Sequence, residues 1–194
     1  MEKLEGFKID KHRVEYCLIP QHTKDEVSAG MLKQFFKIRH DIWVKEKRWE
    51  ESKNCMETDV WDNFSTFIIV LFDGEVCGGG RIIDGNSISL PIKKYIGTDI
   101  PKNSVELSRV VLVDTIPHKY RVKVLIKFYL MIYDYLKKRN YSCYADMRDG
   151  LKRKLAYLGL KTEVVGRTQM RNKHKFTPVK LLFKETETDS YREF

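Results

Sequence analysis

"STFIIVLFDGEVCGGGRIID", residues 65–84, contains two apolar runs on either side of Asp73-Gly74. An Asp-Gly pair between β-branched and aromatic residues is a strong signal for a tight hairpin, so we predict two antiparallel strands here. The glycines Gly78 to Gly80 weaken a strand, but they allow another backbone or a ligand to approach closely. This stretch therefore predicts a β-hairpin with a site of close approach on its second strand.

The segments around this hairpin alternate between strand and helix patterns. "VEYCLIP" (14–20) predicts a first strand. A helix follows, with Thr23 and Glu26 as a capping box and with apolar residues at helical spacing to about Val44. The second hairpin strand is expected to end at Leu90-Pro91. Further strands are predicted at 104–114, 141–147 and 175–185, and further helices at 120–140 and 150–159.

The resulting order is β-α-β-β-β-α-β-α-β. This order favours an α/β (α+β) fold with one central mixed, twisted sheet flanked by helices, in a single domain over residues 1–194. A doubly wound nucleotide-binding sheet would need more parallel βα units and a phosphate loop, and neither is visible.

Composition indicates an ordinary soluble globular protein, with 42% hydrophobic and 32% charged residues among 194. No apolar run approaches the roughly 20 residues that cross a bilayer, and the N-terminus lacks the apolar core of a signal peptide, so we expect a cytoplasmic location. No cysteine lies in a CxxC pair, which argues against a zinc or redox motif. We therefore expect Cys17, Cys55, Cys77 and Cys143 to be small apolar fillers.

The net charge is +9, and the basic surplus lies late in the chain, in residues 151–161 and 166–176. Such a surplus favours an anionic partner: nucleic acid, a membrane surface, a phosphorylated cofactor or an acidic protein. It is also compatible with a merely solubilising surface. A nucleic-acid-binding protein is a weaker interpretation, because no finger or helix-turn-helix pattern appears and the basic residues follow no known binding signature.

An acidic segment, "NCMETDVWDNF" (54–64), places Glu57, Asp59 and Asp62 among apolar residues. Their spacing is not that of a calcium loop and no histidine accompanies them, so we expect no metal. Two other interpretations stay open: an N-capped turn, or a partly buried ion-pair network with arginines, whose planar guanidinium suits bidentate carboxylate pairing.

The sequence resembles the acyl-homoserine-lactone synthase family, a branch of the GNAT-like acyltransferases. The resemblance covers about residues 30–115 and rests on an arginine, aromatic residues, an E-x-D-x-x-D group, a G-x-x-R strand and an E-x-S-R strand in this order. The matching residues are Arg39, Trp43, Trp49, Glu57, Asp59, Asp62, Arg81 and the run Glu106-Leu107-Ser108-Arg109. The resemblance implies a GNAT-like fold, an acyltransferase activity and no tightly bound cofactor.

Three features depart from the family pattern. Trp43 stands where phenylalanine is usual, and "IIDGNSISLPIKKYIG" after Arg81 is more similar to the N-acyl amino acid synthases, such as the N-acyl-tyrosine synthases. The glycines of the usual pyrophosphate loop are missing from "RVKVLI" (121–126), and bulky side chains there would obstruct a diphosphate. Free CoA is therefore a poor donor candidate, and the resemblance implies acyl-phosphopantetheine on acyl carrier protein as the donor.

The resemblance also implies roles for the matching residues. Glu106 and Arg109 are the expected catalytic residues, with Glu106 as the general base or the holder of a water that takes the proton. A salt bridge from Glu106 to Arg109 or Arg81 that only steadies the strand is the alternative. The expected substrate-binding residues are Arg39, Trp43, Trp49, Glu57, Asp59, Asp62 and Arg81.

The basic surplus then has a candidate partner, because acyl carrier protein is acidic. On charge and order alone we expect it to dock on Lys119, Arg121, Lys123, Lys152, Arg153 and Lys154. The leading hypothesis is an N-acyl amino acid synthase of bacterial signalling that transfers a medium- or long-chain fatty acyl group to the α-amine of an amino acid, with tyrosine as a candidate. The alternatives are an acyl-homoserine-lactone synthase that uses S-adenosylmethionine, and a non-catalytic binder of acyl carrier protein.

Overall fold

The structure is a computed structural model that describes residues 1–182 apart from residues 5, 48–54, 158 and 172. The chain forms two compact units, Met1–Ile83 with Ser108–Phe128 and Asp84–Leu107 with Tyr129–Phe194. The boundary falls inside strand β6 (Ser104–Leu112) and inside helix α2 (His118–Lys138), so each unit holds a part of both.

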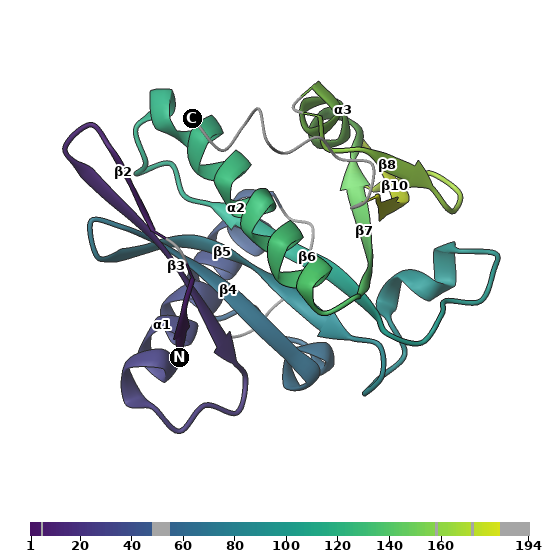
Figure 1. Cartoon of the computed structure of the whole chain (residues 1–194), viewed down its shortest axis with the longest axis horizontal. Helices are drawn as coiled ribbons and strands as arrows, with labels where there is room; N and C mark the ends of the chain where they lie inside the picture. The colour runs from purple at the N-terminus through teal and green to yellow at the C-terminus, as the bar shows by residue number, and fades with distance from the viewer. Residues whose placement is uncertain (5, 48–54, 158, 172, 183–194) are drawn as a thin grey trace. The chain divides into compact units, whose positions relative to one another are not determined.

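The first unit contains a sheet in the order β1-β3-β4-β5-β6, with β2 beside β3. The predicted hairpin is confirmed, because β4 and β5 pair antiparallel and run side by side (Figure 1). Its turn residues have φ of +51° at Asp73 and +86° at Gly74, the left-handed conformation that a two-residue hairpin turn requires. The strands that begin in this unit are β1 (Glu2–Lys3), β2 (Phe7–Ile9), β3 (His12–Pro20), β4 (Ser65–Phe72) and β5 (Glu75–Asp84).

Helix α1 (Glu26–Arg39) continues as a wider π-helical segment, η1 (His40–Glu46), so the predicted helix is confirmed with a slightly later end. The prediction of Thr23 as its cap is wrong. The Asp25 carboxylate accepts from the Ser28 amide at 3.0 Å, while the Thr23 hydroxyl accepts from the Asp25 amide in the preceding turn. The later carboxylate therefore caps the helix.

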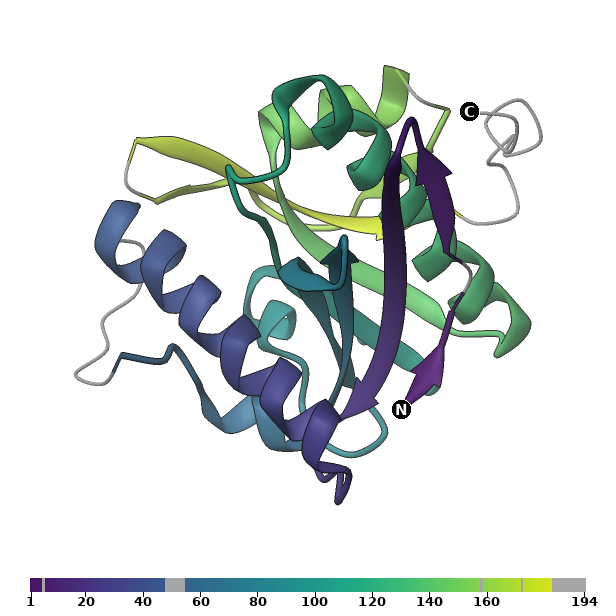
Figure 2. The same ribbon diagram turned by 90° about the vertical axis from the view of Figure 1, so that its left-hand side faces the viewer.

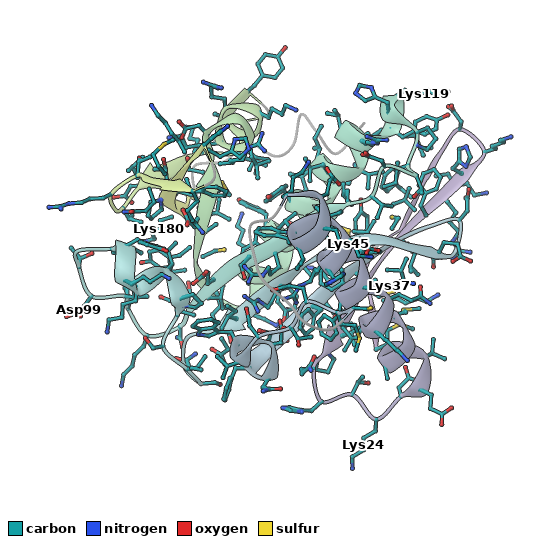
Figure 3. All side chains as sticks on the ribbon, turned by 180° about the vertical axis from the view of Figure 1, so that it is seen from behind. Lys24, Lys37, Lys45, Asp99, Lys119 and Lys180 are labelled. Carbon is teal, nitrogen blue, oxygen red and sulfur yellow. The ribbon has the colours of Figure 1, made fainter. Side chains whose placement is uncertain are left out.

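The core of this unit forms where α1 packs on the sheet. Alternate side chains of β4 point to the same face, and Phe67 meets Phe36 edge to face with ring centroids 5.4 Å apart. Figure 2 shows α1 lying alongside the sheet, and Lys37, labelled in Figure 3, is on the exposed side of the helix. The buried cluster consists of Cys17, Ile19, Leu32, Phe35, Phe36, Phe67, Ile69, Leu71 and Val111.

The glycines of β5 allow close approach on both faces of the sheet, as predicted. A Cβ at Gly79 would lie 2.4 Å from the Ile68 carbonyl oxygen and 3.1 Å from the Phe35 ring of α1. A Cβ at Gly80 would lie 2.8 Å from the ring of Phe128 on α2. The approach is made by neighbouring backbone and by the rings of two helices.

The second unit contains the order β6-β7-β10-β8, with β9 beside β10. Strands β6 and β7 pair parallel, whereas β10 pairs antiparallel with β7, β8 and β9, so the mixed sheet with flanking helices is confirmed. Helix α3 lies beside β7 and β10 (Figure 1). The elements are β7 (Ser142–Arg148), α3 (Asp149–Tyr157), β8 (Thr162–Val164), β9 (Gln169–Arg171), β10 (His174–Leu181) and the 3-10 helix η3 (Pro91–Tyr95).

Two further expectations are corrected. Strand β5 ends at Asp84, because an Asp84–Ser87 turn follows in which the Asp84 side chain accepts from the Asn86 amide at 2.9 Å; Leu90-Pro91 instead begins η3. Cys55 is exposed, while the other three cysteines are buried, so the interpretation as an apolar filler fails for Cys55. Across the described residues, no helix is long and apolar enough to cross a membrane.

We expect Gly79→Ala to lower the free energy of unfolding by about 1–3 kcal/mol, because the new methyl group meets the Ile68 carbonyl. Urea denaturation followed by circular dichroism measures this change. Gly30→Ala is the matched control: apart from the adjacent backbone of α1 itself, no atom lies within 4 Å of the added Cβ, and the higher helix propensity of alanine should stabilise the fold by about 0.5–1 kcal/mol. Equal effects of the two substitutions would contradict the close approach at Gly79.

Candidate functional site

The acidic segment ends in a short 3-10 helix, η2 (Val60–Phe64), which is closed by two of its own carboxylates. Asp59 accepts from the amides of Trp61 at 3.0 Å and Asp62 at 3.2 Å, and Asp62 accepts in return from the Asp59 amide at 2.9 Å. This reciprocal capping box provides acceptors for backbone amides that have no hydrogen-bond partner within the helix. The N-capped turn is therefore present, and it fixes where the carboxylates point.

Arg39, the last residue of α1, joins the helix to this segment. Its side chain has no exposed surface, and its guanidinium donates to Glu57 and to both oxygens of Asp62, at 2.9 and 3.3 Å. The guanidinium carbon also lies 5.2 Å from the centre of the Phe36 ring. Arg39 is thus buried with two carboxylate partners and an aromatic face, the setting in which arginine is favoured over lysine.

Arg81 and Arg109 bring β5 and β6 to the same carboxylates. Arg81 donates to Asp59 and, at 2.7 Å, to Asp62. Arg109 donates to Glu57 at 3.0 Å and to Asp59 at 3.3 Å. The expected ion-pair network is therefore found in the first unit: three arginines from three elements meet three carboxylates of one segment.

Ser108 also belongs to this cluster, although the sequence pattern assigns it no role. Its hydroxyl accepts from Nε of Arg81 at 3.1 Å, which orients the guanidinium toward Asp59 and Asp62. The residue was visible only as the serine of the E-x-S-R strand.

The backbone at Arg109 departs from strand geometry. Its φ is +55°, in the left-handed region that non-glycine residues seldom adopt. The guanidinium carbon lies 5.1 Å from the centre of the Trp43 ring, which η1 supplies. Strain of this kind persists only where the surroundings impose it, and here two carboxylates and an indole hold the side chain.

The network balances charge in a place with little water. Burial pushes the pKa of Glu57 upward, but Arg109 and Arg39 outweigh it, so that pKa lies below its ordinary value. Burial likewise opposes ionisation of Asp62, and Arg39 and Arg81 bring its pKa below the ordinary value. Both carboxylates are therefore charged partners of the arginines at neutral pH.

One side of the network is more accessible than the rest. The side chains of Asp59 and Arg109 are 18% and 15% exposed, whereas Glu57 and Asp62 are 4% and 2% exposed. Trp43, against Arg109, is half-buried. We call Asp59, Arg109 and Trp43 the rim of the network, since these groups are only partly buried.

Glu106 belongs to the second unit, where it is buried at 5% exposure on β6. Its Oε2 accepts from the Ile92 amide of η3 at 2.7 Å. The sequence predicted a base or an ion pair for this carboxylate, and the bond to Ile92 is a contact that neither alternative included. A role of Glu106 as base stays a prediction.

The six residues expected to dock acyl carrier protein have different surroundings. In the first unit, Lys119 pairs with Asp10 at 3.4 Å, Arg121 pairs with Asp114 at 2.6 Å, and Lys123 is half-buried. In the second unit, Lys152 lies 4.0 Å from Asp149, and Arg153 and Lys154 are exposed on α3. Arg121 also donates to the Ile116 carbonyl at 2.7 Å, so it supports the loop before α2 in addition to any docking role.

Trp49, expected to bind substrate, lies outside the described residues. In the described part of the chain, no three histidine, cysteine, aspartate or glutamate side chains are arranged to hold a metal ion. The carboxylates of the acidic segment are occupied by arginines and backbone amides instead.

No protein-family model matches the sequence, and no curated protein is significantly similar to it. Solved structures nevertheless share the fold. The acyl-homoserine lactone synthase LasI superposes with a TM-score of 0.78 at 16% identity, covering 93% of this chain and 95% of that chain.

Two further structures extend this similarity. The CoA-dependent acyl-homoserine lactone synthase BjaI, with S-adenosylmethionine and isopentyl-CoA, gives a TM-score of 0.68 at 18% identity, covering 84% of this chain and 81% of that chain. An acyl-CoA N-acyltransferase from Pseudomonas aeruginosa gives 0.58 at 12% identity, covering 86% and 98%. The predicted GNAT-like fold of the acyl-homoserine lactone synthases is therefore confirmed.

We expect the network to make the stability of the folded protein depend on pH in the acid range. The folded pKa values of Glu57 and Asp62 are lowered, so their stabilisation is complete above the ordinary carboxyl range and is lost as pH falls through the folded values. The free energy of unfolding in urea should therefore decrease as pH is lowered from about 5 to about 3.

Arg39→Met removes the cation that both carboxylates share, so its free energy of unfolding should fall less steeply over the same pH range. Arg13→Met is the control, because Arg13 is 65% exposed and pairs only at the surface with Glu15, at 3.1 Å. Identical pH dependence in both variants and the original protein would show that the network does not cause the effect.

Proposed function

We propose that the protein is an acyltransferase that moves a fatty acyl group from a thioester to an amine, in the manner of the acyl-homoserine lactone synthases. One observation carries the proposal. The arginines and carboxylates that define the resemblance to that family form a single charge-balanced network in the first unit, with Asp59, Arg109 and Trp43 at its accessible side. The fold of the chain, shared with LasI and BjaI, supports it independently.

The reaction requires few protein groups. The neutral amine attacks the thioester carbonyl carbon, a C–N bond forms, and the C–S bond breaks as the thiolate leaves. The amine carries a proton at neutral pH, since its pKa is about 8, and a carboxylate can take that proton directly or through water. The oxyanion that forms in between needs hydrogen-bond donors, which the irregular backbone of β6 around Arg109 can supply.

We assign the acceptor's ammonium group to Asp59. Glu57 is nearly fully buried between Arg39 and Arg109, whereas Asp59 is the most exposed of the three carboxylates. Trp43 would cover one side of the acceptor or of the acyl chain, and Arg109 would face the acceptor's carboxylate. Glu106 is proposed as the base or the holder of the water that takes the proton.

Two acceptors remain in competition. The structural similarity to acyl-homoserine lactone synthases favours S-adenosylmethionine, whose own carboxylate would then close the lactone ring and expel methylthioadenosine. The sequence after Arg81 favours a free amino acid, because "IIDGNSISLPIKKYIG" is more similar to the N-acyl amino acid synthases. We rank S-adenosylmethionine first, since the fold likeness covers most of the chain.

Acyl carrier protein is the proposed donor. Residues 121–126 lie inside α2 and lack the glycines that a diphosphate loop uses, and the net charge of +9 suits an acidic partner. BjaI is CoA-dependent within the same fold, so acyl-CoA is the competing donor. A cytoplasmic location and a part in bacterial signalling would follow from this activity.

We expect the purified protein to acylate an amine when it is supplied with fatty acyl carrier protein, and product masses identify the acceptor. Each donor, acyl carrier protein or acyl-CoA, is paired with S-adenosylmethionine, tyrosine and the other amino acids. Asp59→Asn should raise the KM for the acceptor at least about tenfold, because it removes a charge-assisted contact. Asp41→Asn is the control, since the Asp41 side chain is 45% exposed and pairs with Lys45 at 2.8 Å. If no donor and acceptor pair gives a product, the proposed function is wrong.

We expect the docking residues to affect the donor alone. Alanine at Lys152, Arg153 and Lys154 should raise the KM for acyl carrier protein several-fold and leave the KM for the acceptor unchanged, and the effect should shrink as salt is added. Alanine at Lys119, Arg121 and Lys123 tests the other group separately. An unchanged KM for acyl carrier protein in both triple variants would refute the docking surface.

A further inference from the structure

Glu106 and helix η3 of the second unit hold each other in place. The first helical residue of η3 is Pro91, which has no amide proton, and its N-cap Leu90 offers no side-chain acceptor. The amide of Ile92 is thus the first N–H of the helix that needs a partner, and the buried Glu106 carboxylate accepts from it at 2.7 Å. The position of η3 therefore contributes to the direction in which this carboxylate points.

The far end of η3 is fixed to the segment that leads into β9. Ile96 and Gly166 form an isolated antiparallel bridge, and the Arg167 amide donates to the Tyr95 carbonyl at 3.3 Å. A Cβ at Gly166 would lie 2.2 Å from that same carbonyl oxygen, so only glycine permits the contact. The backbone of η3 is anchored here at one edge.

Arg171 on β9 contacts the side chain of Tyr95, the last residue of η3. Its guanidinium carbon lies 5.6 Å from the centre of the Tyr95 ring and 4.2 Å from the centre of the Phe176 ring on β10. The same guanidinium forms an ion pair with Asp146 on β7, whose side chain is 13% exposed. A planar cation between two rings and a carboxylate makes all of these contacts at once, which lysine does less well.

We propose that Arg171 is a positioning residue for Glu106. Arg171 contacts the Tyr95 ring at one end of η3, and the Ile92 amide at the other end donates to the Glu106 carboxylate. Helix η3 thus connects two residues that lie on different strands, β9 and β6. This inference rests on the proposed function in one respect: Arg171 can affect catalysis only if Glu106 takes part in the reaction. It assigns a role to the hairpin of β9 and β10, whose strand β10 is marked by Lys180 in Figure 3.

Loss of Arg171 should make η3 more mobile, so that the Glu106 carboxylate can adopt other orientations. Because misplacement of a reacting group by about 1 Å can cost a hundredfold in rate, we expect Arg171→Ala to lower kcat about 10- to 100-fold. The KM values for donor and acceptor should stay unchanged, since Arg171 is not among the residues proposed to bind either of them. Arg171→Lys keeps the charge and should recover at least part of the lost kcat.

Arg167→Ala is the matched control. It removes the same charge from the same segment, but the Arg167 side chain is exposed and only its backbone amide contacts η3. This variant should keep the original kcat. Equal kcat values for Arg171→Ala and Arg167→Ala would overturn the proposal.

Hydrogen exchange at the Ile92 amide tests the same inference without catalysis. Exchange should be faster in Arg171→Ala than in Arg167→Ala, because the bond to Glu106 is less often formed. Unchanged exchange overturns the proposal whatever the value of kcat. If Arg171→Ala does not fold, both measurements are made on Tyr95→Leu instead. This variant removes the aromatic ring that Arg171 contacts. A protein that acylates no amine refutes the proposed function, while the exchange result still decides the role of Arg171.

Discussion

The buried pairing of three arginines with three carboxylates is the constraint on which the first unit depends. Moving a charge out of water costs several kcal/mol, and that cost is met only if each charge has a partner of good geometry. Arg39 ends α1, Arg81 lies in β5 and Arg109 lies in β6, so the helix and both strands must converge on one short segment. Removing any one member leaves an uncompensated charge, which costs about 3–5 kcal/mol in proteins.

The convergence also explains the local irregularities nearby. The segment from Glu57 to Asp62 is held by its own capping box, which leaves carboxylate oxygens free to receive guanidinium groups from outside. Arg109 adopts a left-handed backbone in the middle of a strand, and its side chain then reaches both Glu57 and Asp59. Local strain and a buried charge network thus support each other, as is common at functional sites.

Much of this could be predicted from the sequence, because periodicity and turn chemistry are local signals. The hairpin at Asp73-Gly74 and the long helices followed from them, and the network was anticipated from arginines and carboxylates in a known order. The strands β8 and β9 have three residues each and are too short for a period to appear. The bond from Glu106 to Ile92 was missed because it joins a side chain to a backbone amide, which no residue pattern reveals.

The network contains equal numbers of positive and negative groups, and this balance limits which ligands it can bind. A ligand that presents only one charged group to the network would leave one member without a counterpart, whereas an α-amino and α-carboxylate pair can place one charge of each sign against Asp59 and Arg109 and preserve neutrality there. The α-amino and α-carboxylate groups of S-adenosylmethionine and of a free amino acid form the same zwitterion. Discrimination between such acceptors must therefore come from whatever surrounds the remainder of the molecule.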